Sequence, residues 1–117
     1  MSETSKMDPV WKARWVAALR SGEYRQGRGA LLDDDGRYCC LGVLTDLCVK
    51  DGLVSQWEWG YPDYEVEGSE GVVPVSVQRI TGMPDADPVT VDGQTLSYFN
   101  DTGSSFEEIA DLIEEVL

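Results

Sequence analysis

The stretch YCCLGVLTDLCVK, residues 38–50, decides the fold. An advance of about 100° per residue, as in an α-helix, places Leu44, Leu47 and Cys48 within one quarter of a turn. Leu41 and Val43 flank this stripe, and only a narrow opposite strip is polar. That strip consists of Gly42, Thr45 and Asp46. A helix with so much apolar surface is normally buried on most sides. We therefore expect it to be the central helix around which the other elements pack.

An amphipathic helix is predicted towards each end of the chain. The first begins at the pair Asp8-Pro9, because Asp caps helices and Pro suits the first helical turn. The last begins at Ser105, and Glu108 three residues later completes a capping-box pattern. Its apolar residues then fall on one face and its acids on the other. Both helices are expected to cover the central one.

The remaining stretches predict short elements, so the fold class is α+β. Short helices are expected at residues 74–82 and 94–100, the second with Leu96 and Phe99 facing inward. Strands are expected at residues 29–32, 37–39, 64–66 and 88–91. We predict a single compact domain at 8–117 with about five helices, a small antiparallel sheet, and a disordered tail at 1–7.

The charge is strongly acidic and unevenly distributed. The formal net charge is −13, with +3 on residues 1–30 and −16 on residues 31–117. Such a body repels nucleic acid and attracts basic protein surfaces. Residues 96–115 could pair as two helices, but they lack a basic recognition helix for DNA. The polar start and the absence of a long apolar run favour the cytoplasm of a bacterial host cell and no membrane contact. The oligomeric state stays open.

Most catalytic and metal chemistry lacks its usual residues. The chain has no histidine, which removes the commonest general base and most catalytic zinc sites. Its three cysteines are expected to be buried thiols. The run Asp33-Asp34-Asp35-Gly36 lacks the ligand spacing of a calcium loop and predicts a solvated turn. We expect no metal, no cofactor and no catalytic residue, and keep an enzyme using carboxylates or Tyr24 as an alternative.

The connector after the first helix is the first candidate binding site. Guanidinium groups and glycine-flanked backbone amides can hold a phosphate or a carboxylate. The candidate ligand-binding residues are Arg20, Tyr24, Arg25, Gln26, Gly27 and Arg28. The alternative is that these arginines pair with the protein's own acids. The site predicts an anionic, nucleotide-type ligand if the arginines converge.

An aromatic, acidic stretch at residues 53–71 is the second candidate. Aromatic residues rimmed by acids are typical anchors for a basic protein partner. The candidate partner-binding residues are Trp57, Trp59, Tyr61 and Tyr64. The alternative is a loop folded back over the core.

Two segments resemble small proteins encoded by bacteriophages and prophages. One is RWVAALRSGEYRQGRGALLDDDGRYCCLGVLTDL, residues 14–47, which is similar to that family's Tyr-x-Gln-Gly connector and Tyr/Phe-Cys-Cys-Leu-Gly-Val-Leu helix. The other is FNDTGSSFEEIADLIE, residues 99–114, and VPVSVQRITGM at 73–83 matches more loosely. The resemblance implies a phage context and no reaction. The residues matching its polar motif are Tyr24, Gln26 and Gly27.

Together these observations predict a non-enzymatic phage accessory protein. It would bind and inhibit a host protein with a basic surface, a defence component in our hypothesis, through its acidic body and aromatic loop. The alternative is a sponge that sequesters a phosphorylated, nucleotide-type signal molecule at the connector.

Overall fold

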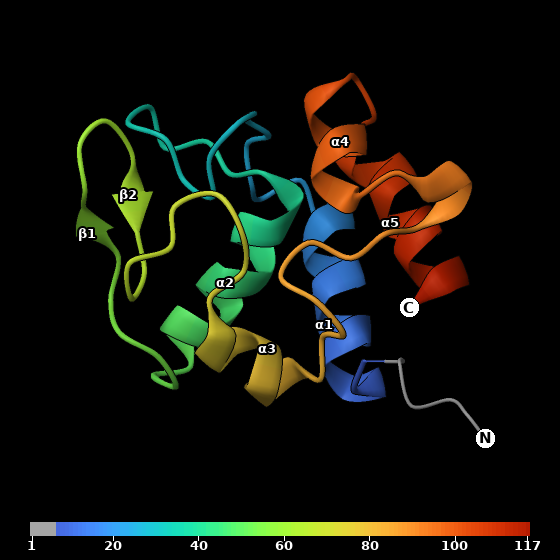
Figure 1. Ribbon diagram of the computed structural model, residues 1–117, viewed down its shortest axis with the longest axis horizontal. Coiled ribbons are helices and arrows are strands. Elements are labelled where there is room, and N and C mark those ends of the chain that lie inside the picture. Colours follow the sequence, from blue (N-terminus) through green and yellow to red (C-terminus); the bar gives the residue numbers. More distant parts are fainter. Residues whose placement is uncertain (1–6) are drawn as a thin grey trace.

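The predicted central helix is α2, Cys40–Lys50, and it lies in the middle of the molecule (Figure 1). The computed structural model describes residues 7–117. Within α2 only Leu47 and Lys50 escape full burial. The helix begins at Cys40 because Cys39 is extended and occupies the N-cap position. Contacts from α1, α3 and α4 surround it, so the expected buried core helix is confirmed.

The two terminal helices pack against each other. Helix α1 is Pro9–Arg20, and the Asp8 carboxylate caps it by accepting from the amides of Val10 and Trp11. Helix α5 is Phe106–Val116, and it carries the expected capping box. The buried Trp15 of α1 donates its indole N–H to the carbonyl of Cys40 at 2.9 Å, which ties α1 to the start of α2.

Two short helices complete the helical part. Helix α3 is Val75–Thr81 and ends at Gly82, whose φ of 74° is the left-handed conformation that favours glycine. Helix α4 is Leu96–Asp101, preceded by a 3₁₀ turn at Val91–Gly93. Leu96 is buried as predicted, but Phe99 is only half-buried. The second buried position of α4 is Asn100, whose amide joins a polar network described below.

The sheet is smaller than predicted. Strands β1, Glu58–Trp59, and β2, Tyr64–Glu65, form one antiparallel pair in which Glu58 faces Glu65 and Trp59 faces Tyr64. The strands predicted at 29–32, 37–39 and 88–91 are wrong, because these segments make only isolated bridges. Left-handed turns at Gly29 and Gly36 bend the chain before pairing can extend.

Residues 7–117 therefore form a compact α+β domain with five α-helices and a two-stranded antiparallel sheet, which confirms the predicted class. Of the tail predicted at 1–7, residues 1–6 lie outside the described residues. Met7 is 3% exposed and belongs to the core. In the described part of the chain, no helix has the length and apolar character needed to cross a membrane.

Candidate functional site

Tyr24, the first residue of the phage-like polar motif, is anchored to α2. Its hydroxyl donates to the Asp46 carboxylate at 2.7 Å and accepts from the Lys50 ammonium at 3.2 Å. Its ring meets that of Tyr38 edge to face at 5.0 Å. Burial and the Asp46 hydrogen bond raise the pKa of Tyr24 to about 12, so the phenol keeps its proton near neutral pH.

Asp46 is the residue that sequence reasoning missed. It is 3% exposed, and its second oxygen accepts the indole N–H of Trp57 at 2.9 Å. The carboxylate thus joins the connector, the central helix and the start of the hairpin. The sequence did contain a signal for this role. Asp46 stands in an otherwise apolar helix, and a carboxylate buried there requires hydrogen-bond or ion-pair partners.

The half-buried Gln26 and the buried Asn100 form a second hydrogen-bond network, here called the polar bracket. The Gln26 amide donates to the Asn100 side chain at 3.0 Å and to the carbonyl of Ser104 at 2.8 Å. Its oxygen accepts the amide of Phe106 at the start of α5. The Asn100 oxygen also accepts the amide of Cys40, and its nitrogen donates to the carbonyl of Gly27. The Gln26 amide thus already bonds the protein itself, and its ligand-binding role stays a prediction.

Gly27 is required by close packing. A Cβ on Gly27 would lie 2.8 Å from the Cβ of Arg37 and 3.2 Å from an Asp33 carboxylate oxygen. Its amide donates to the carbonyl of Tyr38 at 2.7 Å. The Tyr-x-Gln-Gly motif is therefore explained by hydrogen bonds and packing within the protein.

The connector arginines do not gather at one point. Arg20 donates to Asp111 and Glu114 on α5 and does not line the hollow described below. Arg25 donates to the carbonyl of Asp35 at 3.2 Å. Arg28 is exposed and has no hydrogen-bond or ion-pair partner among residues 7–117. Two of the three arginines thus contact the protein's own groups, as the alternative interpretation held.

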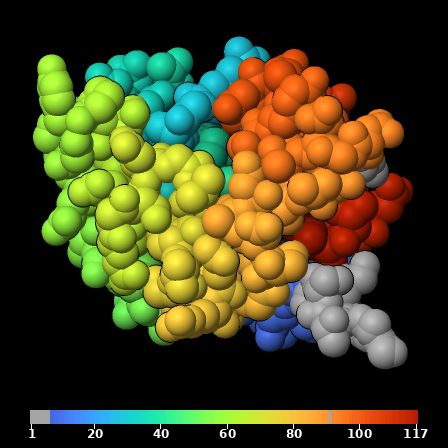
Figure 2. Space-filling model, viewed as in Figure 1, coloured from blue at the N-terminus to red at the C-terminus, as the bar shows by residue number. Residues whose placement is uncertain are grey.

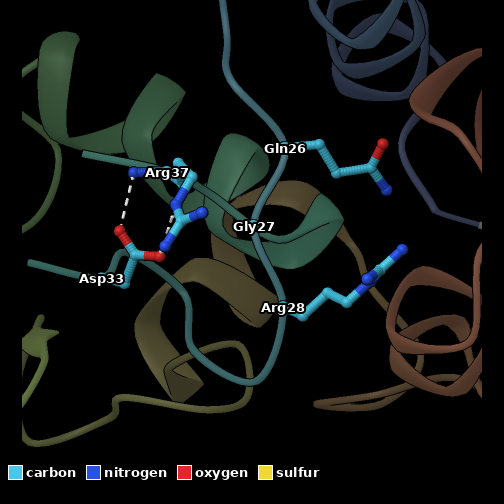
Figure 3. Close-up of a pocket in the computed structure, with 5 residues that line it drawn as sticks. All are labelled: Gln26, Gly27, Arg28, Asp33 and Arg37. Carbon is cyan, nitrogen blue, oxygen red and sulfur yellow. Dashed lines mark hydrogen bonds and ion pairs between the residues drawn. The ribbon is translucent and has the colours of Figure 1, made fainter. Parts of the chain in front are cut away.

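A hollow of about 340 Å³ lies beside Gly27. Its lining consists of Gln26, Gly27, Arg28, Asp33 and Arg37. Figure 3 shows Gln26 and Arg28 extending to one side of the chain at Gly27, whereas Asp33 and Arg37 lie on the other. Arg37 is paired with Asp33 at 3.1 Å and with Asp35 at 3.0 Å. Arg28 is consequently the single unpaired cation of the hollow's lining.

The Asp33–Asp35 turn brings three carboxylates within 4.8 Å of one another. Asp33 accepts from the amides of Asp35 and Arg37 and from the Arg37 side chain. These bonds lower the pKa of Asp33 against the opposing effect of its burial, which is the largest single influence. The cluster is thus held by its own backbone and by Arg37, as in a solvated turn.

The aromatic stretch divides into a half-buried base and an exposed tip. Trp57 is half-buried, donates to Asp46 and packs on Tyr38, so it has partners within the protein and its role in a partner surface stays a prediction. Trp59 is 50% exposed and Tyr61 80% exposed. The ring of Trp59 packs edge to face on those of Tyr61 and the half-buried Tyr64. The ring centroids are 6.0 Å apart in the first pair and 5.1 Å apart in the second.

These residues belong to the β1–β2 hairpin, at the left edge of the molecule in Figures 1 and 2. We call Glu58 to Glu65 the hairpin tip. The described structure thus separates the two sequence-predicted sites. Most polar side chains of the connector bond to other groups of the protein, whereas the hairpin tip exposes aromatic rings to solvent.

The chain belongs to the DUF8296 family, a domain of unknown function whose model matches residues 7–117. Searches of curated proteins and of solved structures gave no match. Inference about function therefore starts from the geometry of the two sites.

Proposed function

We propose that this protein is a non-enzymatic binding protein that inhibits a partner with a basic surface. The hairpin tip is the contact. Following the resemblance to phage-encoded proteins, the proposed partner is a host protein, and a defence component is our first candidate. The observation that carries the proposal is the exposure of Trp59 and Tyr61 on a projecting hairpin.

The exposed rings of Trp59 and Tyr61 contact each other, and contiguous exposed apolar groups mark interaction sites more often than single ones do. Trp and Tyr are the residues most enriched at the energetic centres of protein interfaces. The acids Glu58, Asp63 and Glu65 lie in the same segment, and the whole molecule carries −13. This charge accelerates encounter with a basic surface, whereas the aromatic rings supply contact area.

Three groups with raised pKa values lie away from the hollow, whereas Asp33, whose pKa is lowered, lines it. Burial raises the pKa values of Cys39 and Cys40, and that of Tyr24 is also raised. All three groups hold their protons near neutral pH. They lie in core contacts or beside α2 and do not line the hollow.

The test is affinity capture from a bacterial lysate with three proteins. These are the wild type, the double variant Trp59→Ala/Tyr61→Ala, and the control Val75→Ala/Tyr98→Ala. The control removes exposed apolar side chains from α3 and α4 instead. We expect at least one host protein to be retained by the wild type and the control and lost from the hairpin variant. Retention should weaken with salt, because screening shortens the reach of exposed charges.

The captured protein is then purified, and its activity is measured with each variant. Inhibition by the wild type and the control, but not by the hairpin variant, is the expected outcome. Equal capture and inhibition by all three proteins would contradict the hairpin as the contact.

A second candidate function is supported by Arg28 beside the hollow. A volume of about 340 Å³ lies in the range of small-ligand sites, and Arg28 offers an unpaired guanidinium. A nucleotide-type anion bound there at 100 times its dissociation constant would stabilise the fold by roughly 2.7 kcal/mol. A thermal-shift panel of nucleotides, with Arg28→Ala as the control, tests this sponge function separately from capture.

A further inference from the structure

The outer edge of the hairpin is an unpaired strand edge. Within residues 7–117, β1 pairs with β2 alone, whereas β2 also bridges to Leu32 on its other side. Figure 1 shows β1 as the outermost strand. Both β1 residues are exposed. An exposed edge presents backbone N–H and C=O groups that another extended chain can pair with.

The two faces of the hairpin differ in chemistry. Cross-strand partners share a face, so Trp59 and Tyr64 lie on one face and Glu58 and Glu65 on the other. The aromatic face continues to Tyr61, whose ring meets that of Trp59. A strand added beside β1 would direct alternate side chains to the carboxylate face and to the aromatic face.

On the carboxylate face, Glu58 and Glu65 lie directly opposite each other. Directly opposed residues place their Cβ atoms about 5 Å apart, and like charges there are destabilising. Neither Glu58 nor Glu65 has an ion-pair or hydrogen-bond partner in the described part of the chain. The Glu65 carboxylate instead lies over Gly60, where a Cβ would be 3.0 Å from its carboxyl carbon. A guanidinium beside Glu58 would relieve this repulsion, because Arg binds carboxylates with two parallel hydrogen bonds.

We propose that the partner contributes an extended segment that adds to the free edge of β1. Its arginine side chains face Glu58, and its alternate side chains face Trp59. This inference rests on the proposed function and names the chemistry of the contact. Backbone pairing supplies the geometry, and the carboxylate face selects against neutral and acidic strands.

The test uses three capped peptides and the full isotope-labelled chain. The first alternates Arg and Val, the second has the same composition in two blocks, and the third is the alternating peptide with N-methylated amides. Nuclear magnetic resonance follows the backbone amides of Glu58 and Trp59 and the indole of Trp59. We expect the alternating peptide to bind at the hairpin at least about tenfold tighter than the other two, because only it can both pair and match the faces.

Two charge variants distinguish strand addition at β1 from non-specific attraction of the basic peptide to the acidic protein. Glu58→Lys is expected to weaken the alternating peptide at least about tenfold, since it places a cation opposite Glu65. Glu115→Lys makes the same charge change on the exposed surface of α5 and should change binding by less than about twofold. Equal weakening by both variants would overturn the proposal.

Equal binding of the three peptides would also overturn strand addition. The proposed function would stand in that case if the captured host protein still required Trp59 and Tyr61. Capture that is independent of those two residues would overturn both inferences.

Discussion

The connector and the hairpin tip are alike in sequence and opposite in structure. Both are rich in polar and aromatic residues, and both are candidate binding sites on composition. In the connector, Gln26 and Tyr24 bond to partners on α2, α4 and the start of α5. At the hairpin tip, Trp59 and Tyr61 are exposed and the opposed Glu58 and Glu65 lack a described partner. The polar groups of Tyr24 and Gln26 therefore have their partners inside the molecule, whereas the rings of Trp59 and Tyr61 face solvent.

The largest effect is expected where Leu31, just after the connector, touches the central helix. A Cβ on Gly42 would overlap the carbonyl oxygen of Leu31 and lie 2.7 Å from its carbonyl carbon. Because the obstacle is backbone, Gly42→Ala should destabilise by about 4 kcal/mol or prevent folding. Urea denaturation measures this. Gly71→Ala is the control, since nothing lies within 4 Å of its Cβ. Similar stabilities for the two variants would contradict this close approach.

The polar bracket should be the next most sensitive feature. Asn100→Ala removes a side chain that accepts from Gln26 and Cys40 and donates to Gly27 and Asp101. We expect a loss of about 3 kcal/mol, because buried groups are left without partners. Gln94→Ala, which removes a half-buried amide, should cost under about 1 kcal/mol. A small effect at Asn100 would weaken the contrast between the two regions.

The burial of Tyr24 and its bond to Asp46 should appear in the pH dependence of stability. The folded pKa of Tyr24, about 12, exceeds the ordinary value of 10. The unfolded chain therefore releases this proton first, so stability falls as the pH rises from about 10 to 12. Tyr24→Phe should lose about 1 kcal/mol at pH 7 and show a smaller further fall.

The measurement compares urea midpoints of the two proteins from pH 7 to alkaline pH. Ionisation of the buried thiols also lowers stability at alkaline pH, since burial raises the pKa of Cys39 to about 11. Both proteins contain these thiols, so this contribution cancels in the comparison. Parallel pH profiles would contradict a pKa of Tyr24 raised by its burial and its bond to Asp46.

The hairpin tip should matter least for stability. Tyr61 is 80% exposed, so Tyr61→Ala should change the free energy of unfolding by less than about 0.5 kcal/mol. The same variant should weaken partner binding, because an aromatic anchor is removed. A large loss of stability would place Tyr61 with the connector residues and remove the contrast.

The helices were predictable because their signals are local. The cap at Asp8, the capping box at Ser105 and Glu108, and the apolar character of α2 all act within one or two turns. The strands were less predictable, since pairing depends on distant segments such as Leu32 and Tyr64. Only the short strand at Tyr64–Glu65 matched an expected one.

The candidate site was predicted in part. Sequence placed Trp59 and Tyr61 in an acidic, aromatic stretch, which is where the exposed rings lie. It could not separate them from Trp57, because the bond from Trp57 to Asp46 joins different elements. The sequence also grouped Gln26 with the arginines. The hydrogen bond from the Gln26 amide to Asn100 joins residues far apart in the chain, so no local pattern reveals it.

The Asp46 carboxylate has one more consequence. It receives Tyr24 from the connector and Trp57 from the base of the hairpin, so folding itself immobilises the segment that carries β1. The conformational entropy of that segment is then lost before any partner arrives. Association with a hairpin held in this way forfeits little further entropy, which favours tight binding from a small contact area.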